Sequence, residues 1–224
     1  MRTATVEDFS DKHLHEPIVR GFLHRPPDGF EEAIILTHAA ASNCQSPLLV
    51  ALATAFSADG IAVLRCDLPF RLARPNGRPP ASYAARDQAG LRRAIELIKA
   101  KVSKKIYLGG HAYGGRQSSL LAASDPNLVA GLLLLSYPLH PPRQSTPLRT
   151  HHFSLLRTPA MFVQASKDPF GTPDEVGAAL SKISAPTKLV ILEGGRHELL
   201  SDGNSQTLAD TVVREFREFF GLTT

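Results

Sequence analysis

The sequence predicts an α/β fold with a mostly parallel central sheet and helices on both of its faces. Two observations support this prediction. Short runs of aliphatic and β-branched residues alternate with longer segments of helical periodicity along the 224 residues. Several of the short runs are almost entirely apolar, as expected for central strands buried on both faces. We expect a single domain over residues 1–224, because this length suits one core and leaves no room for a separate cap.

The predicted strands are the short apolar runs. In chain order they are Ile18–Leu23, Ala33–His38, Ile61–Cys66, Lys105–Leu108, Val129–Ser136, Ala160–Gln164 and Lys188–Leu192.

Helix signals fall between these runs. The stretch Ser46–Gly60 has a serine cap, a proline in the first turn and a closing glycine. Apolar residues recur at helical spacing within Ser82–Val102, and a last amphipathic stripe runs from Leu208 to Phe219. The segment Thr172–Glu175 is a capping box. We assign these apolar stripes to core packing against the sheet.

Composition excludes several classes of protein. With 43% hydrophobic residues and a net charge of +4, the chain is not disordered. No apolar run approaches the ~20 residues of a membrane span, and the N-terminus lacks the apolar core of a signal peptide. The cations are spread out, so we expect no nucleic-acid partner. Cys44 and Cys66 are too few for a disulfide framework or a cysteine-rich zinc site. We therefore expect a cytoplasmic protein without a membrane or nucleic-acid partner.

The segment Lys105–Gln117 carries the most chemical information. A strand leads into a glycine-flanked turn, and the turn opens a helix of small residues. Within it, Gly110-His111-Ala112-Tyr113-Gly114 has the frame of a nucleophile elbow, Gly-x-Ser-x-Gly, with alanine in the serine position. The central residue of an elbow has a positive φ, and side chains two residues away would collide with it unless both are glycine.

An acid and a histidine follow the elbow in the chain order that this chemistry uses. Asp168 comes just after the strand Ala160–Gln164, and His197 comes just after Lys188–Leu192. In such an arrangement the acid orients the imidazole, and the imidazole takes a proton from the nucleophile. An aspartate before proline is commonly a turn former, but Thr172 can cap the following helix without it. The remaining histidines lack metal-ligand spacing, so we expect no metal and no cofactor.

The oxyanion hole is expected from main-chain donors. One is the N–H of Tyr113, and the other is the N–H of Ala39 or Ala40, in the loop after Ala33–His38. For His38 we favour anchoring of this loop over a chemical role.

The substrate pocket is expected between the loops Leu68–Pro80 and Pro138–Pro159. Candidate lining residues are His38, His111, His140 and Phe170. Four arginines near these loops either attract an acidic substrate or form a solvated surface: Arg71, Arg74, Arg143 and Arg149.

The chain resembles small, cap-less α/β-hydrolases, close to the dienelactone-hydrolase-like group. The resemblance covers about Ile18 to Phe220. It is carried by Asp67-Leu-Pro-Phe-Arg, Gly109-Gly-His-Ala-Tyr-Gly-Gly-Arg, Tyr137-Pro-Leu-His-Pro-Pro, Val163-Gln-Ala-Ser-Lys-Asp-Pro-Phe-Gly and Gly194-Gly-Arg-His. It implies a serine-hydrolase type of site that acts on a small ester-like substrate. The departure is Ala112, because these relatives carry Ser or Cys at that position.

A methyl group cannot attack a carbonyl carbon, so the chain as it stands should be inactive or nearly so. Three explanations remain open: replacement of a serine in an active enzyme, a natural non-catalytic protein that binds a ligand or partner, and relocation of the nucleophile. Relocation is the weakest. Ser118 points to a different face of the helix and Ser119 lies two turns deeper, whereas Ser42 and Cys44 have no strained turn to present them. The intact glycines, Asp168 and His197 favour a substituted enzyme.

Overall fold

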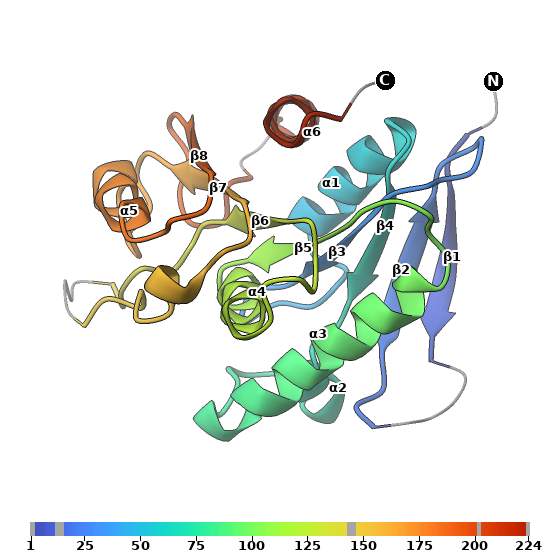
Figure 1. The fold of residues 1–224 in the computed structure, drawn as a ribbon, viewed down its shortest axis with the longest axis horizontal. Helices are drawn as coiled ribbons and strands as arrows, with labels where there is room; N and C mark the ends of the chain where they lie inside the picture. Colours follow the sequence, from blue (N-terminus) through green and yellow to red (C-terminus); the bar gives the residue numbers. More distant parts are fainter. Residues whose placement is uncertain (1–2, 12–15, 143–146, 201–202, 223–224) are drawn as a thin grey trace.

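The structure is a computed structural model that describes residues 3–11, 16–142, 147–200 and 203–222. Its described strands form one sheet in the order β1-β2-β4-β3-β5-β6-β7-β8 (Figure 1). Strand β2 pairs antiparallel with β1 and β4, and every other neighbouring pair is parallel. The strands are β1 (Thr5–Ser10), β2 (Arg20–Arg25), β3 (Ala33–Thr37), β4 (Ala62–Cys66), β5 (Ile106–His111), β6 (Gly131–Leu135), β7 (Ala160–Ala165) and β8 (Thr187–Leu192).

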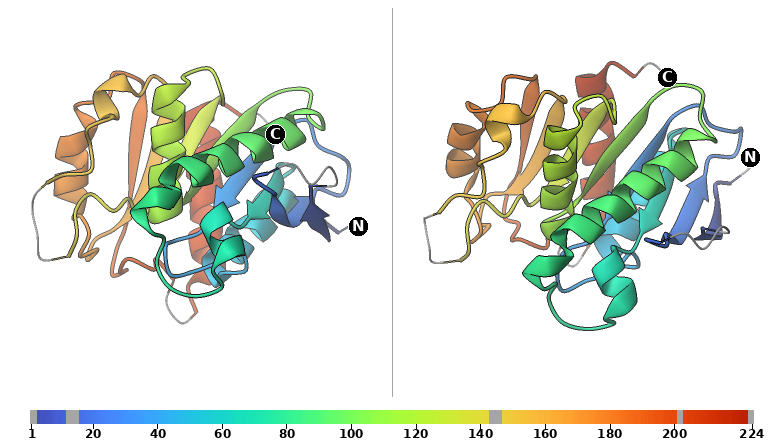
Figure 2. Two further views of the ribbon diagram at one scale, coloured as in Figure 1. Left: turned by 90° about the horizontal axis from the view of Figure 1, so that it is seen from below. Right: turned by 60° about the horizontal axis from the view of Figure 1, so that its bottom comes forward.

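Helices cover both faces of this sheet (Figures 1 and 2), which confirms the expected fold class. Helices α1 and α6 pack side by side on one face, and α3, α4 and α5 cover the other. The helices are α1 (Pro47–Ala58), α2 (Pro69–Ala73), α3 (Ala84–Lys99), α4 (Tyr113–Ser124), α5 (Pro173–Leu180) and α6 (Ser205–Phe220), with short 3₁₀ turns at Ala81–Tyr83 and Phe153–Leu155.

The central strands supply both cores, because successive side chains of a strand point to opposite faces. In β3, Ile34 and Leu36 pack under α1 and α6, whereas Ala33 and Ile35 pack under the helices of the other face. All five residues of β3 are buried. The apolar runs in the sequence are explained by this burial on both faces.

Two elements were not expected from the sequence. Strand β1 lies at the edge of the sheet, and most of its residues are exposed. It contains the charged residues Glu7 and Asp8 and no apolar run, so the sequence gives no strand signal there. Helix α2 lies inside Leu68–Pro80, which was expected to be a loop. Proline occupies its first turn, and Asp87 accepts a hydrogen bond from the Phe70 N–H at 2.9 Å. That contact comes from a residue 17 positions away, so local sequence does not reveal it.

The parallel strands β3, β5, β6, β7 and β8 end at the same edge of the sheet, and the loops that follow them meet there (Figure 2). The elbow, Asp168 and His197 all lie in these loops or turns. Among the described helices, none is both long enough and apolar enough to cross a membrane.

Candidate active site

Ala112 occupies a strained turn between β5 and α4. Its φ is 48° and its ψ is −107°, and it directly precedes the first residue of α4. This confirms the positive φ expected at the elbow. A Cβ on Gly110 would lie 2.5 Å from the Thr37 carbonyl oxygen, and a Cβ on Gly114 would lie 2.7 Å from the His38 carbonyl oxygen. Glycine is therefore required at both positions, because the obstructing atoms belong to main chain that cannot swing away.

The turn places the Tyr113 N–H at the start of α4 with no hydrogen-bond acceptor among the described residues. The neighbouring amides are used: the Ala112 N–H donates to the Leu135 carbonyl at 2.8 Å, and the Gly114 N–H donates to the His38 carbonyl at 3.2 Å. A free N–H at a helix N-terminus is a good donor to a negatively charged oxygen.

The loop after β3 is held by its own carbonyl groups. The Ala39 carbonyl accepts hydrogen bonds from His38 Nδ1 at 2.8 Å and from the Ser42 N–H at 3.0 Å. The His38 carbonyl faces the Gly114 N–H, and a trans peptide directs its C=O and N–H in opposite directions. The Ala39 N–H therefore points away from the start of α4, which leaves the Ala40 N–H as the better placed of the two expected donors.

His38 is buried behind this loop. Its Nδ1 donates to the Ala39 carbonyl, and its Nε2 accepts from the Leu68 N–H at 3.1 Å. Burial lowers the pKa of His38 to about 4, so the ring is neutral near pH 7. With both ring nitrogens engaged, His38 ties the β3 loop to the segment that enters α2.

Asp168 and His197 form a hydrogen-bonded pair. The side chain of Asp168 is 0% exposed, and its two oxygens lie 3.0 and 2.9 Å from His197 Nδ1. The Phe170 N–H donates to Asp168 Oδ1 at 2.9 Å, which is the geometry of a short polar turn. His197 Nε2 has no partner among the described residues, so it is available to a reacting group.

Gln164 fixes Asp168 from behind, and the sequence analysis did not identify this residue. Its side-chain amide donates to Asp168 Oδ2 at 2.9 Å and to the Gly171 carbonyl at 2.8 Å, and it accepts from the Tyr137 N–H at 3.0 Å. The signal that could have found it is a polar amide at the end of the otherwise apolar strand β7. A buried amide in such a place must have partners.

Two rings enclose the imidazole of His197. Phe170 stacks on it with a centroid distance of 4.1 Å, and His111 lies on it at 5.3 Å. His111 Nε2 also contacts the His197 carbonyl at 2.8 Å, and burial lowers the pKa of His111. His111 precedes Ala112, so this contact joins the elbow directly to the loop that carries His197.

The other expected site residues divide into near and distant ones. The His140 N–H donates to the Phe170 carbonyl at 3.0 Å, which brings His140 beside Phe170. The Tyr113 side chain points towards α3, where its hydroxyl donates to Asp87 at 2.8 Å. Burial raises the pKa of Asp87.

Of the four arginines, Arg143 lies outside the described residues, and Arg74 is exposed. Arg71 is buried and donates only to main-chain carbonyls. Arg149 is partly buried, and its pKa is lowered by burial and by the nearby positive charge of Arg116. Arg116 lies one turn after Ala112, and its buried Nε has no hydrogen-bond partner.

The alternative nucleophiles are poorly placed. Ser118 and Ser119 are completely buried, and their hydroxyls donate to carbonyls of the preceding helical turn. Ser119 Oγ also lies 2.8 Å from His152 Nε2, but this pair is inside the protein. Cys44 is buried as well, and burial raises the pKa of its thiol to about 12, so the thiolate is scarce near neutral pH.

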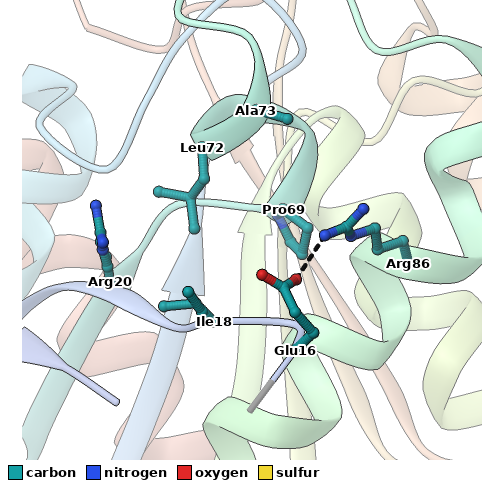
Figure 3. Close-up of a pocket in the computed structure, with 7 residues that line it drawn as sticks. All are labelled: Glu16, Ile18, Arg20, Pro69, Leu72, Ala73 and Arg86. Atoms are coloured by element: carbon teal, nitrogen blue, oxygen red, sulfur yellow. Dashed lines mark hydrogen bonds and ion pairs between the residues drawn. The ribbon is translucent and has the colours of Figure 1, made fainter. Parts of the chain in front are cut away.

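A separate cavity of about 220 Å³ lies between α2, α3 and the segment that leads into β2 (Figure 3). Glu16 and Arg86, which form an ion pair, both line it. The lining residues are Glu16, Ile18, Arg20, Pro69, Leu72, Ala73 and Arg86. None of them belongs to the elbow or to the Asp168–His197 pair.

Comparison with known proteins agrees with the fold. The sequence profile of a family described as an alpha/beta hydrolase domain matches residues 30–220. A dienelactone hydrolase from Anabaena variabilis superposes with a TM-score of 0.78 and 18% identity, covering 97% of this chain and 99% of that chain. A serine hydrolase homologue from Coxiella burnetii superposes with a TM-score of 0.74 and 20% identity, covering 93% of this chain and 96% of that chain. A serine hydrolase without a lid from Xanthomonas campestris superposes with a TM-score of 0.73 and 16% identity, covering 99% of this chain and 97% of that chain.

Proposed function

Because the chain belongs to the alpha/beta hydrolase domain family, we propose that its site is that of a serine hydrolase for small ester-type substrates, with position 112 as the nucleophile position. The observation that supports this most directly is the buried Asp168–His197 pair beside an elbow that keeps its strained φ. A chain with no use for the pair has no evident reason to hold a fully buried carboxylate against an imidazole.

With serine at position 112, each step has a residue to perform it. The serine Oγ attacks the ester carbonyl carbon while His197 Nε2 takes its proton, and Asp168 stabilises the imidazolium that forms. The oxyanion of the tetrahedral intermediate accepts hydrogen bonds from the N–H groups of Tyr113 and Ala40. His197 then gives its proton to the leaving alcohol, and an acyl-enzyme remains. In the second half, His197 takes a proton from a water molecule that attacks the acyl carbonyl carbon, and it returns this proton to the serine as the carboxylic acid is released.

The chain with Ala112 keeps the binding and electrostatic parts of this site and loses the covalent step. It should bind an ester and turn it over little, because the oxyanion hole and binding alone supply roughly 10³-fold over water in comparable sites. The second candidate function, a non-catalytic ligand-binding protein, is favoured by one observation, which is the methyl group of Ala112 itself.

For the substrate, we favour an ester with a negatively charged group. Arg116 and Arg149 place two positive charges near each other at the elbow helix, and neither forms an ion pair with a described residue, although Arg149 donates to the Pro138 carbonyl at 3.3 Å. Two partly buried like charges are unfavourable unless an anion joins them. A half-ester of a dicarboxylic acid should therefore have a lower KM than a neutral ester of equal length, and Arg149→Met should remove that difference.

The experiment that tests the proposed function is Ala112→Ser, assayed with short p-nitrophenyl esters. We expect hydrolysis to rise by at least about 10³-fold over the Ala112 chain. No gain in a folded Ala112→Ser variant would contradict the hydrolase proposal. A thermal-shift screen of esters and carboxylates against the Ala112 chain would then test the binding alternative.

A further inference from the structure

The guanidinium of Arg71 fills a cage of five main-chain carbonyl oxygens. Its Nε donates to Ser42 at 2.7 Å, and its two terminal nitrogens donate to Ala40 at 2.8 Å, Gly77 at 2.9 Å, Arg74 at 3.0 Å and Pro75 at 2.8 Å. A guanidinium has five N–H donors, so every donor is used. Arg71 is 7% exposed and forms no ion pair with a described residue. Its charge is balanced by these carbonyl dipoles and by the ring of Phe70, whose centroid lies 4.9 Å from the guanidinium carbon.

The five carbonyls come from two segments. Ala40 and Ser42 belong to the β3 loop, defined as residues 39–45, and Arg74, Pro75 and Gly77 belong to the turn after α2. Arg71 itself is part of α2. One side chain therefore binds the β3 loop to a helix and turn about 30 residues further along the chain.

Other contacts hold the β3 loop on either side of Ala40, at the Ala39 carbonyl and at Cys44, and Arg71 holds the Ala40 carbonyl between them. Residues 39–41 are all alanine, so no long side chain anchors them in the core. The peptide before Ala40 is fixed through the Ala39 carbonyl by His38 and Ser42, and the peptide after Ala40 is fixed through the Ala40 carbonyl by Arg71. The Ala40 N–H belongs to the first of these peptides, and the Arg71 contact limits its direction from the peptide that follows.

We propose that Arg71 is the positioning residue of the oxyanion hole, acting by holding the Ala40 peptide through its five-carbonyl cage. The proposal rests on the proposed function in one respect, which is the role of the Ala40 N–H as an oxyanion donor. It adds a residue that touches neither the substrate nor the reacting atoms. It also implies that the cage, once emptied by truncation, is a site for a free guanidinium ion.

The test compares Ala112→Ser with the double variant Ala112→Ser/Arg71→Ala. We expect kcat for p-nitrophenyl butyrate to fall by about 10²-fold with KM little changed, as for loss of an oxyanion-hole donor. Millimolar guanidinium chloride should restore most of the lost kcat, whereas sodium chloride at the same concentration should not. The matched control is Ala112→Ser/Arg78→Ala, because Arg78 lies exposed in the same segment, and neither its kcat nor its response to guanidinium should change.

Two results would overturn the proposal. One is an unchanged kcat in the Arg71→Ala variant, and the other is a loss that guanidinium does not reverse although circular dichroism shows a folded protein. If Arg71→Ala does not fold, Arg71→Lys replaces it, since lysine keeps the charge but has only three donors. An intermediate loss of kcat at constant KM then supports the proposal, and full activity contradicts it.

Failure of the proposed function is separable from failure of this inference. If Ala112→Ser alone shows no hydrolysis, Arg71→Ala is introduced into the unsubstituted chain, and hydrogen exchange of the β3 loop amides is measured. Faster exchange that guanidinium reverses supports the positioning role. Exchange equal to that of the unsubstituted chain rejects it.

Discussion

The two halves of the candidate site are held in different ways. The acid–histidine half consists of side chains: Gln164 fixes Asp168, Asp168 fixes His197, and Phe170 stacks on the imidazole. The oxyanion half consists of main chain. Its shape depends on the strained turn at Ala112, on Gly110 and Gly114, where any side chain would clash with main-chain atoms, and on the carbonyls that Arg71 binds. One half can lose its chemistry by a single side-chain change, whereas the other loses it only when the backbone moves. Ala112 lies where the two meet.

The largest effect should come from removing the histidine. In Ala112→Ser, the further change His197→Gln should abolish nearly all of the gain, a loss of about 10³-fold or more in kcat. In the Ala112 chain the same change should have little effect, because His197 has no nucleophile to deprotonate. Steady-state kinetics of the four variants measures this coupling. Equal losses in both backgrounds would show that the two halves do not cooperate.

The main-chain half should respond to added volume. Gly110→Ala should lower the free energy of unfolding by about 3 kcal/mol, because its Cβ would meet the Thr37 carbonyl oxygen. Gly177→Ala in α5 is the matched control, since its Cβ would find only an ordinary contact 3.7 Å away. It should stabilise the protein by about 0.5 to 1 kcal/mol. Urea unfolding monitored by circular dichroism measures both, and similar values would contradict the steric argument.

The side-chain half should respond to loss of its buried amide. In Ala112→Ser, the change Gln164→Leu should lower kcat by about tenfold, because Asp168 loses one of the contacts that orient it. Gln206→Leu, on the exposed surface of α6, should leave kcat unchanged. A Gln164→Leu variant with full activity would show that the Phe170 N–H is sufficient to hold the carboxylate.

Acidification should weaken the protein through buried neutral histidines. Burial lowers the pKa values of His24, His38 and His152 to about 4, whereas a histidine in the unfolded chain titrates near 6.5. Between these values the unfolded state binds more protons, so stability falls as pH decreases from about 6.5, by up to about 1.4 kcal/mol per pH unit for each histidine. Urea unfolding at a series of pH values measures this slope.

The control for that slope is His24→Gln. Glutamine can still accept the hydrogen bond from Arg65 Nε, which spans 2.8 Å to His24 Nε2 in the structure. The variant should lose part of the dependence on pH between roughly 4 and 6.5, and His38, His111 and His152 should account for the rest. An unchanged slope would mean that His24 takes up no extra proton on unfolding.

The smallest expected effect concerns the elbow strain itself. Ala112→Gly should raise the free energy of unfolding by about 1 kcal/mol, because glycine adopts positive φ without a steric penalty. Ala178 is exposed within α5, and Ala178→Gly should lower the free energy of unfolding by a similar amount. Thermal unfolding of both variants tests the difference in sign.

The central strands and the elbow could be predicted because their signals are local. The strands β3 to β8 are apolar runs, and the elbow depends on glycines at fixed spacing. Strand β1 could not, since its exposed residues Thr5–Ser10 form a strand only by pairing with β2. Asp168 and His197 could also be predicted, because each follows a strand that ends at the same edge of the sheet and they occur in the chain order that the chemistry uses. The roles of Gln164 and Arg71 could not be predicted, because their partners are largely main-chain groups of other loops, and no residue pattern indicates such contacts.

The conformation of Ala112 also has a genetic consequence. Any alanine codon becomes a serine codon by one change of its first base, and no other adjustment of the elbow is needed, since serine requires the same backbone turn. If the gene is placed in a laboratory host that depends on an ester for carbon, a single point mutation therefore supplies the serine hydroxyl at position 112. Variants recovered from such a selection should carry their change at codon 112 far more often than at any other codon.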